Sequence, residues 1–436
     1  MFCQVIVDIN HEDVDRVFTY RVPKGMTLCP GMRVHVPFGP RKLEGVVVEM
    51  VQECDLPPER VKDVADTLED YPAVLPSLLE LAEHIQKTSF CTLAMALRLM
   101  VPAQMRGQRV HEKTQEIAAL TVDSDVLGQV IAAQTRAPKR AKVLRALKEA
   151  PAHELSLSAL KETVGDCRDA VNTLAKMGFV KLEKREKLRN PYGAMEQLSQ
   201  QDPQLTRQQE NVLSELLPAI EQGKGSFLLY GVTGSGKTEV FIRAVRKAAQ
   251  LGKTAIVLVP EIALTPQMVM WFRSRFGEDA AVLHSRLSPG ERFDEWRRIR
   301  RGDVRVVIGA RSAIFAPLEH VGLIIIDEEH EQSYIADSMP RYDARELAQE
   351  RCRREGGVLL LASATPSMRS FAMAGRGDLT LLEMPRRVHN RPMPTVHIVD
   401  MREELKKGNR SVFSGELVNG LSRCLKAGKQ AILFVN

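Results

Sequence analysis

The sequence predicts a multidomain chain whose largest part is an α/β domain with a parallel sheet and helices on both faces. A length of 436 residues is more than one domain usually holds. From about residue 204 onward, wholly apolar runs alternate with stretches of helical periodicity, which is typical of buried parallel strands joined by helices. Before residue 105, short alternating runs indicate a separate β-rich domain.

The N-terminal region, residues 1–105, is predicted to be a small β-barrel or sandwich with helical packing. Turns rich in Gly and Pro separate its expected strands, and a helical stretch follows at residues 78–99. The expected strands are residues 5–9, 17–22, 33–38 and 43–48.

Residues 106–195 change character and favour helices. Helical spacing covers residues 139–148, 158–164 and 168–177, and Gly178 is a plausible C-cap for the third helix. A basic strand pair is expected at 179–189. Three short helices followed by a ribbon are the order of a winged helix, and a plain helical linker domain is the alternative. The polar residues 196–203 are expected to be a linker.

Residues 204–400 are predicted to form one α/β lobe, and residues 401–436 are predicted to begin a second. The expected strands are residues 227–230, 255–259, 281–283, 304–308, 323–326 and 358–361 in the first lobe, and 431–435 in the second.

Composition limits the function only loosely. The formal net charge of +6 is weak support for a polyanionic partner, since many metabolic enzymes are equally basic. No C-x-x-C pair occurs among the seven scattered cysteines, so no zinc ribbon is expected within this chain, and a reducing cytoplasm fits. The N-terminus is acidic where a signal peptide is basic, and no apolar run reaches 18 residues, so no membrane association is expected.

The strongest motif is Gly-Val-Thr-Gly-Ser-Gly-Lys-Thr at 231–238, which fits the P-loop pattern G-x-x-x-x-G-K-[ST]. It lies between an apolar run and a helical stretch, as that pattern requires. Its backbone N–H groups and the helix N-terminus would face phosphates. Lys237 is expected to reach the β- and γ-phosphates of ATP, and Thr238 to ligate Mg²⁺. The expected nucleotide contacts are Gly231, Thr233, Gly234, Ser235, Gly236, Lys237 and Thr238.

A second motif ends the apolar run 323–326 in Asp327-Glu328-Glu329-His330. We expect Asp327 to hold Mg²⁺, usually through water, and Glu328 to polarise the attacking water. His330 would couple the nucleotide site to elements that contact DNA. The alternative, surface acids after a strand, is disfavoured by the P-loop about 90 residues earlier.

A third motif, Ser-Ala-Thr-Pro at 363–366, ends the apolar run 358–361. Small hydroxyl residues at the end of a strand can couple the phosphate state to conformation, which makes Ser363 and Thr365 candidates. Alone the motif is weak, and its position after the acidic box strengthens it.

Together these motifs resemble the superfamily 2 helicases, and within them the PriA family of bacterial replication-restart helicases. The distinctive stretches are Pro-Glu-Ile-Ala-Leu-Thr-Pro-Gln at 260–267 and Gly-Ala-Arg-Ser-Ala at 309–313. The resemblance implies a RecA-like first helicase lobe, a winged-helix domain and a domain that binds the 3′ end of DNA. It also implies an ATP-dependent 3′-to-5′ DNA helicase acting in replication restart and primosome assembly at stalled forks.

The resemblance implies further site residues in the α/β lobe. Gln209 would read adenine with help from Arg207, and Thr265, Arg311 and Ser312 would contact the DNA backbone with little sequence preference. An aromatic-rich loop that links DNA contact to hydrolysis corresponds to 331–345, and single strands would stack on its aromatics. The matching positions in this loop are Tyr334, Arg341, Tyr342 and Arg345.

In the N-terminal region the resemblance implies a site for a 3′ end. Phe18 would stack on the terminal base, Gly39 would let the backbone approach, and Lys62 would offer a cation to phosphate. Two positions depart from the family pattern. Thr19 stands where many members have Asp, which softens end selectivity, and Asp343 stands where His is typical, which weakens DNA contact.

Six arginines surround Trp296 and invite a DNA-binding interpretation. A solvated helix face explains them better, because arginine also favours helices. They are Arg292, Arg297, Arg298, Arg300, Arg301 and Arg305.

The resemblance places the end of the chain at the first strand of a second RecA-like lobe. In this class the second lobe supplies an arginine finger for hydrolysis, and the family's zinc insertion would follow residue 436. We therefore expect a truncated chain that binds ATP and DNA but hydrolyses little ATP and unwinds nothing. The expected partners are forked, branched and single-stranded DNA, single-strand-binding protein and other primosome proteins, in the bacterial cytoplasm near the nucleoid. The alternatives are a non-hydrolysing fork-DNA-binding module and a P-loop ATPase unconnected with nucleic acid.

Overall fold

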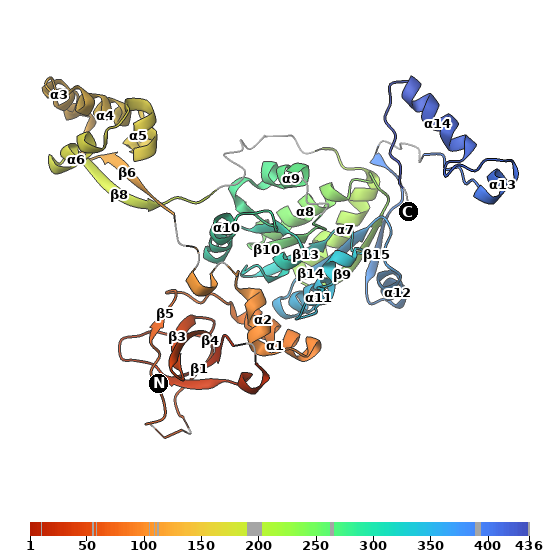
Figure 1. Cartoon of the computed structure of the whole chain (residues 1–436), viewed down its shortest axis with the longest axis horizontal. Coiled ribbons are helices and arrows are strands. Elements are labelled where there is room, and N and C mark those ends of the chain that lie inside the picture. Colours follow the sequence, from red (N-terminus) through yellow and green to blue (C-terminus); the bar gives the residue numbers. More distant parts are fainter. Residues whose placement is uncertain are drawn as a thin grey trace. The chain divides into compact units, whose positions relative to one another are not determined.

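The computed structural model describes residues 1–434 except 10, 55, 58, 104, 109, 111–112, 190–202, 262–265 and 389–393. The chain divides into two compact units, Met1–Val388 and His389–Asn436, of which the first holds nearly all of the ordered core (Figure 1). Within the described part of the chain, no helix has the length and apolar character needed to cross a bilayer.

The N-terminal domain is a curled antiparallel sheet in the order β2-β1-β4-β3-β5. The two sides of this order approach each other, since the rings of Phe18 and Phe38 lie 5.1 Å apart, and the interior is filled by buried valines. The four predicted strands are confirmed, and the short fifth strand was not predicted. The strands are β1 (Phe2–Val7), β2 (Phe18–Arg21), β3 (Arg33–Phe38), β4 (Arg41–Val51) and β5 (Asp66–Thr67).

The single helical stretch predicted at 78–99 is two helices, α1 (Pro76–Ser89) and α2 (Leu93–Met100). The chain leaves the helical conformation at Phe90, whose φ is 49°, and Thr92 caps the new helix by accepting a hydrogen bond from the Met95 amide. Both helices share one continuous hydrophobic core with the α/β lobe, so these two parts of the first unit pack together.

Residues 114–186 form a small three-stranded antiparallel sheet, in the order β7-β6-β8, packed with four helices. The three predicted helices are confirmed. The strand pair predicted at 179–189 is wrong: no turn residue interrupts β8, which is one strand paired with the distant β6. The elements are β6 (Thr114–Leu120), α3 (Ser124–Ala133), α4 (Pro138–Glu149), β7 (Glu154–Ser156), α5 (Leu157–Val164), α6 (Arg168–Lys176) and β8 (Val180–Glu186).

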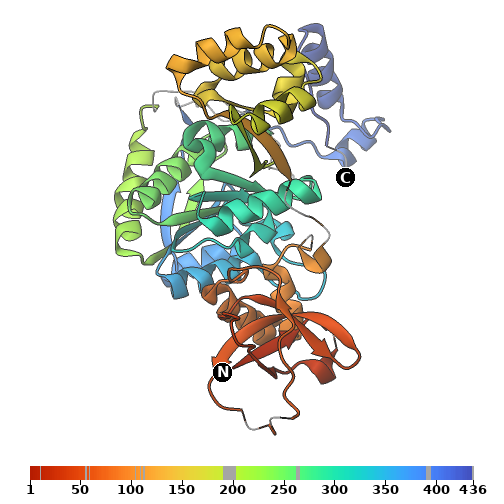
Figure 2. The ribbon, with the colours of Figure 1, turned by 90° about the vertical axis from the view of Figure 1, so that its left-hand side faces the viewer.

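The α/β lobe has a seven-stranded parallel sheet in the order β11-β12-β10-β13-β14-β9-β15. The parallel sheet and six of its strands are confirmed, whereas β15 and the strand order were not predicted. Neighbouring residues along each strand enter different cores: Ile324 packs on one face and Ile325 on the other. Helices cover both faces (Figure 2). The strands are β9 (Gly225–Gly231), β10 (Thr254–Leu258), β11 (Ala280–Leu283), β12 (Val306–Gly309), β13 (Val321–Ile326), β14 (Val358–Ser363) and β15 (Thr380–Met384).

The two faces of this sheet differ in what covers them. Helices α7, α8 and α9 contribute to the core on one face, while α10 and α11 join α1 and α2 in the core on the other. The helices of the lobe are α7 (Arg207–Gln222), α8 (Lys237–Gln250), α9 (Pro266–Phe276), α10 (Pro289–Arg301), α11 (Ala344–Glu355) and α12 (Met368–Arg376).

The prediction of a solvated face is wrong for Arg297 and Arg298 of helix α10, although Arg301 and Arg305 are exposed. Trp296, Arg297 and Arg298 are all buried. Their charges have partners: Arg297 pairs with Glu186 at 2.5 Å, and Arg298 pairs with Glu295 at 2.8 Å. A buried guanidinium is tolerated only when such partners replace water, and the sequence alone did not reveal them.

The second unit contains α13 (Met401–Lys406) and α14 (Gly415–Lys426). The strand predicted at 431–435 is absent from its described part, 431–434. Ile432 and Phe434 are almost fully exposed there. An apolar run becomes a strand only where another strand accepts its backbone hydrogen bonds, and the described residues of this unit offer none.

Candidate nucleotide-binding and DNA-contact site

The P-loop joins β9 to α8 at the carboxyl edge of the parallel sheet. Gly234 and Gly236 adopt φ values of 80° and 87°, which favour glycine because a side chain is strained there. The Lys237 ammonium folds back and donates to the Gly231 carbonyl at 2.8 Å, while the buried Ser235 hydroxyl lacks a hydrogen-bond partner among the described residues. The loop therefore has the shape of a phosphate cradle with one polar atom still unsatisfied.

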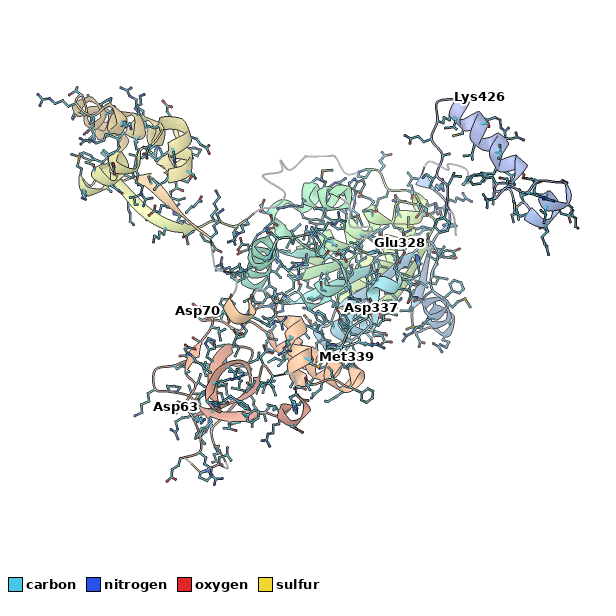
Figure 3. All side chains as sticks on the ribbon, in the orientation of Figure 1. Asp63, Asp70, Glu328, Asp337, Met339 and Lys426 are labelled. Atoms are coloured by element: carbon cyan, nitrogen blue, oxygen red, sulfur yellow. The ribbon has the colours of Figure 1, made fainter. Side chains whose placement is uncertain are left out.

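The acidic motif follows β13, two strands away from β9 at the same edge (Figure 3 labels Glu328). The Asp327 amide donates to the Leu258 carbonyl at 2.9 Å, which fixes the motif to the tip of β10. Burial, followed by the charge of Glu328, raises the pKa of Asp327 to about 6, and the charge of Lys237 opposes that rise. The structure thus brings the lysine and the carboxylates together.

Glu329 is a functional candidate that the sequence analysis overlooked. It is fully buried, and its carboxylate accepts hydrogen bonds from the Ser367 amide at 2.6 Å and the Ser370 hydroxyl at 2.8 Å. Its own amide donates to the Ala362 carbonyl. Glu329 therefore ties the acidic motif to the segment after β14. A third acid directly after an apolar strand was the available sequence clue.

His330 and Ser363 lie together, as a coupling role would require. The His330 Nδ1 and Ser363 Oγ atoms are 2.8 Å apart, and the same hydroxyl accepts from the Thr365 amide at 2.9 Å. The three candidates for coupling therefore form one hydrogen-bonded chain between the tips of β13 and β14. Their role in coupling stays a prediction.

Gln209 lies against the P-loop and is buried. It completes a capping box with Thr206 at the start of α7, and its Nε2 donates to the Gly236 carbonyl at 3.1 Å. Both ends of the Gln209 amide are therefore occupied by the chain itself, and Arg207 is exposed beside it. Adenine recognition by these two residues stays a prediction.

The aromatic-rich loop is mostly folded into the lobe. Tyr334 is fully buried, and its hydroxyl donates to the carbonyls of Asp327 at 2.6 Å and Leu258 at 3.2 Å. Tyr342 is buried against Phe315, and the Arg311 guanidinium lies 5.7 Å from the Tyr342 ring centre. Neither tyrosine ring presents an open face for a base in this structure, so these two DNA contacts remain predictions that the geometry does not support directly.

The remaining predicted DNA contacts of the lobe lie at its surface or outside the described residues. Ser312 and Arg341 are exposed, and the Arg341 carbonyl accepts from the Ser89 hydroxyl of α1 at 2.6 Å. Figure 3 labels Asp337 and Met339 in the same loop. Thr265 falls in the undescribed segment 262–265.

In the N-terminal domain, Phe18 lies at the start of β2, where its ring meets Phe38 and where Arg16 lies 5.2 Å from the ring centre. Gly39 directly follows Phe38, has a φ of 57°, and has open space where a side chain would project. Lys62 is exposed at the other end of β2, where its carbonyl accepts from the Arg21 amide at 2.9 Å. Phe18 and Gly39 are therefore neighbours, whereas Lys62 lies in a separate segment beside the far end of β2.

Comparisons with known proteins agree with this arrangement. The model of a 3′DNA-binding domain (3′BD) of PriA matches residues 4–102, and that of the DEAD/DEAH box helicases matches residues 206–374. Over the full length of this chain, 36% of the aligned residues are identical to those of the replication restart protein PriA of Bacillus subtilis. The chain is therefore similar to the PriA proteins from its first residues to its last.

Other PriA relatives match along nearly the whole chain as well. The protein of Synechocystis is 35% identical over 99% of this chain, and that of Haemophilus influenzae is 31% identical over 97%. This chain covers 62% of the Bacillus subtilis protein, 60% of the Synechocystis protein and 57% of the Haemophilus influenzae protein. The chain therefore spans about three fifths of the length of the curated PriA proteins that it matches.

The two departures from the PriA pattern have local structural roles. Asp343 caps α11 by accepting from the Arg345 amide at 2.9 Å, and it pairs with the Arg345 guanidinium at 2.7 Å. Its negative charge is therefore balanced within the lobe. Thr19 lies in β2 opposite Gln4 of β1. The predicted effects of both departures on DNA binding stay predictions.

Proposed function

We propose that this chain carries the nucleotide- and DNA-binding parts of an ATP-dependent 3′-to-5′ DNA helicase that acts in replication restart and primosome assembly at stalled forks. The observation that supports it most is the convergence of the P-loop after β9 and the acidic motif after β13 at the same edge of one parallel sheet. Such convergence is what a nucleoside triphosphate and its metal ion require.

The residues of the site fit ATP with Mg²⁺. Ser235 has an unsatisfied buried hydroxyl, and Gly231 leaves no room for a side chain beside Ser235 and Lys237, so the cradle is shaped for a close polar ligand. Thr238 and Asp327 would hold Mg²⁺, which neutralises charge on the phosphates. Lys237 would bind the β- and γ-phosphates, and Glu328 would orient water and accept its proton.

The other parts of the chain would engage DNA. We assign residues 1–105 to binding of a 3′ end through Phe18, Gly39 and Lys62, and residues 106–195 to a winged-helix domain. We assign residues 204–400 to the first RecA-like lobe and residues 401–436 to the start of the second. Forked and single-stranded DNA are the proposed ligands, and single-strand-binding protein and other primosome proteins are the proposed partners.

Calorimetry of the purified chain with MgATP tests the nucleotide site. Lys237→Ala should weaken binding roughly 10- to 100-fold, because a charge-assisted contact to phosphate is lost. Lys224→Ala removes an exposed lysine near the opposite end of β9 and is the matched control, expected to bind like the unsubstituted chain. If the unsubstituted chain takes up no nucleotide with magnesium present, the proposal fails.

A labelled fork with a recessed 3′ end tests the DNA assignment separately. Phe18→Ala should weaken binding of that fork by roughly 1–3 kcal/mol, the range for loss of base stacking on an aromatic ring. The same substitution should leave binding of a fork with a blocked 3′ end unchanged. Equal losses on both forks would contradict the assignment of Phe18 to the 3′ end.

A further inference from the structure

The segment that follows β15 runs directly along the P-loop. The Val232 amide donates to the Met384 carbonyl at 3.1 Å, and the Val388 amide donates to the Gly234 carbonyl at 2.9 Å. These two hydrogen bonds lie at either end of residues 384–388, so the short segment is held against the loop at two points. The sequence alone had suggested no role for these residues.

A third attachment comes from the first turn of α7. The Gln208 side chain pairs with the backbone of Arg386: its Oε1 accepts from the Arg386 amide at 2.9 Å, and its Nε2 donates to the Arg386 carbonyl at 3.5 Å. The next residue, Gln209, holds the Gly236 carbonyl. One helical turn therefore positions the P-loop and the 384–388 segment together.

Within this segment, the Arg387 side chain lies beside Gly234 of the P-loop. Its Cγ and Cδ atoms would be 3.9 Å from a Cβ atom placed on Gly234. Its Nε–H is buried and has no hydrogen-bond partner among the described residues. Buried donors without partners are uncommon in folded proteins, and here the orphaned donor belongs to a permanent cation beside a phosphate cradle.

We propose that Arg387 binds the phosphate groups of the nucleotide held by the P-loop, as a second cation in addition to Lys237. The inference rests on the proposed function and deepens it. A guanidinium offers planar, paired donors that match phosphate oxygens, whereas the ammonium of Lys237 is a point charge. Arg387 would thus satisfy its buried Nε–H only when a nucleoside di- or triphosphate is bound.

The test is calorimetry with MgADP and MgATP on the chain and on three variants. Arg387→Ala should weaken both nucleotides roughly 10-fold, and Arg387→Lys should recover only part of that loss because it keeps the charge without the fork. Arg386→Ala is the matched control, since Gln208 holds Arg386 by its backbone, and it should bind as the unsubstituted chain does. Melting temperatures without nucleotide should be equal for all four proteins.

Each outcome decides between the two proposals. If Arg387→Ala binds both nucleotides as tightly as the unsubstituted chain while Lys237→Ala does not, the role of Arg387 is refuted and the P-loop site stands. If Arg387→Ala only lowers the melting temperature, the residue is structural and the inference is refuted as well. If the unsubstituted chain binds neither nucleotide, both proposals fall together.

Discussion

Tyr334 shows how one residue can join two motifs that are distant in sequence. Its hydroxyl donates to the backbone at the tip of β10 and to the carbonyl of Asp327, so it fixes the spacing between two strand ends at the site. The resemblance to helicases pointed to a role in DNA stacking, but the ring is enclosed in the lobe core. Its structural consequence is to hold the acidic motif in place.

Tyr334→Phe should therefore destabilise the lobe by about 1–2 kcal/mol, because the buried hydrogen bond to the Asp327 carbonyl is lost while the ring stays packed. The midpoint of urea unfolding, followed by tryptophan fluorescence, measures this. Tyr230→Phe is the matched control, because no described hydrogen bond involves the Tyr230 hydroxyl, and its midpoint should be unchanged. Equal midpoints for Tyr334→Phe and the unsubstituted chain would show that the hydroxyl contributes nothing.

Residue types alone made Lys237 and Asp327 candidates for the site but did not single out Glu329 or Arg387. The first two belong to a local pattern whose spacing reflects the strand–loop–helix geometry. The roles of Glu329 and Arg387 depend on segments brought together by the sheet, Ser367 in one case and Gly234 in the other. Burial of a charged group and its partners are properties of the folded sheet, so a single sequence does not display them.

At the scale of elements, α11 connects the aromatic-rich loop to the N-terminal helices. Asp343 begins the helix as its cap, and Glu350 near its end lies in an ionic cluster that reaches α1 through Arg354 and Glu80. The helix also packs into the core shared with α1 and α2. Substitutions at its ends should therefore change stability in ways that local chemistry predicts.

Asp343→Ala should destabilise the protein by about 1–2 kcal/mol, because it removes both the helix cap and the ion pair with Arg345. Asp343→Asn should lose less stability, since the Asn side-chain oxygen can still accept a hydrogen bond from the Arg345 backbone N–H. Thermal unfolding measures which of the two variants is less stable. Asp378→Ala breaks only an exposed pair with Arg376 and should change stability by less than about 0.5 kcal/mol.

Glu350→Gln should lower stability at neutral pH but not in acid. Hydrogen bonds from Arg353 and Arg354 lower the pKa of Glu350 from 4.5 to about 2 in the folded state, and the His84 ring also faces it at 3.8 Å. Because the folded pKa lies below the ordinary value, the stabilisation is complete above pH 4.5 and is lost as the pH falls toward 2.

We expect a difference of about 1 kcal/mol between Glu350→Gln and the unsubstituted chain at pH 7, since partly exposed arginines give only a part of the full electrostatic gain. Urea unfolding at pH 7, 5 and 3.5 measures how the difference shrinks. Glu346→Gln, on the same helix with an exposed partner, is the control and should show a smaller difference. A difference that grows in acid would contradict the assignment.

At the scale of the whole molecule, the sequence predicted the parallel sheet because its central strands are apolar on both faces. The edge strand β15 was missed because it alternates exposed and buried residues and carries Glu383. A strand was also predicted at 431–435, because that run is apolar like the central strands. The prediction is wrong for the described residues 431–434. An apolar run does not reveal whether a neighbouring strand will pair with it. The shared core of α1, α2 and the lobe also depends on contacts far apart in sequence.

The second unit should be much less protected than the first. Helices α13 and α14 are 6 and 12 residues long, and neither buries an apolar side chain. Short helices without tertiary packing are marginal in water, so their amides should open locally rather than with the core. Helix α8, with 14 residues and a buried apolar face, is the matched reference within the first unit.

Native-state hydrogen exchange followed by mass spectrometry measures the difference. Amides of α14 should exchange at least about 100-fold faster than those of α8 at the same pH and temperature, because opening α8 requires disrupting the sheet core. Ser414→Ala, which removes the cap of α14, should speed exchange in α14 alone. Protection of α14 equal to that of α8 would contradict the prediction, since it would require apolar burial that the helix lacks within its own unit.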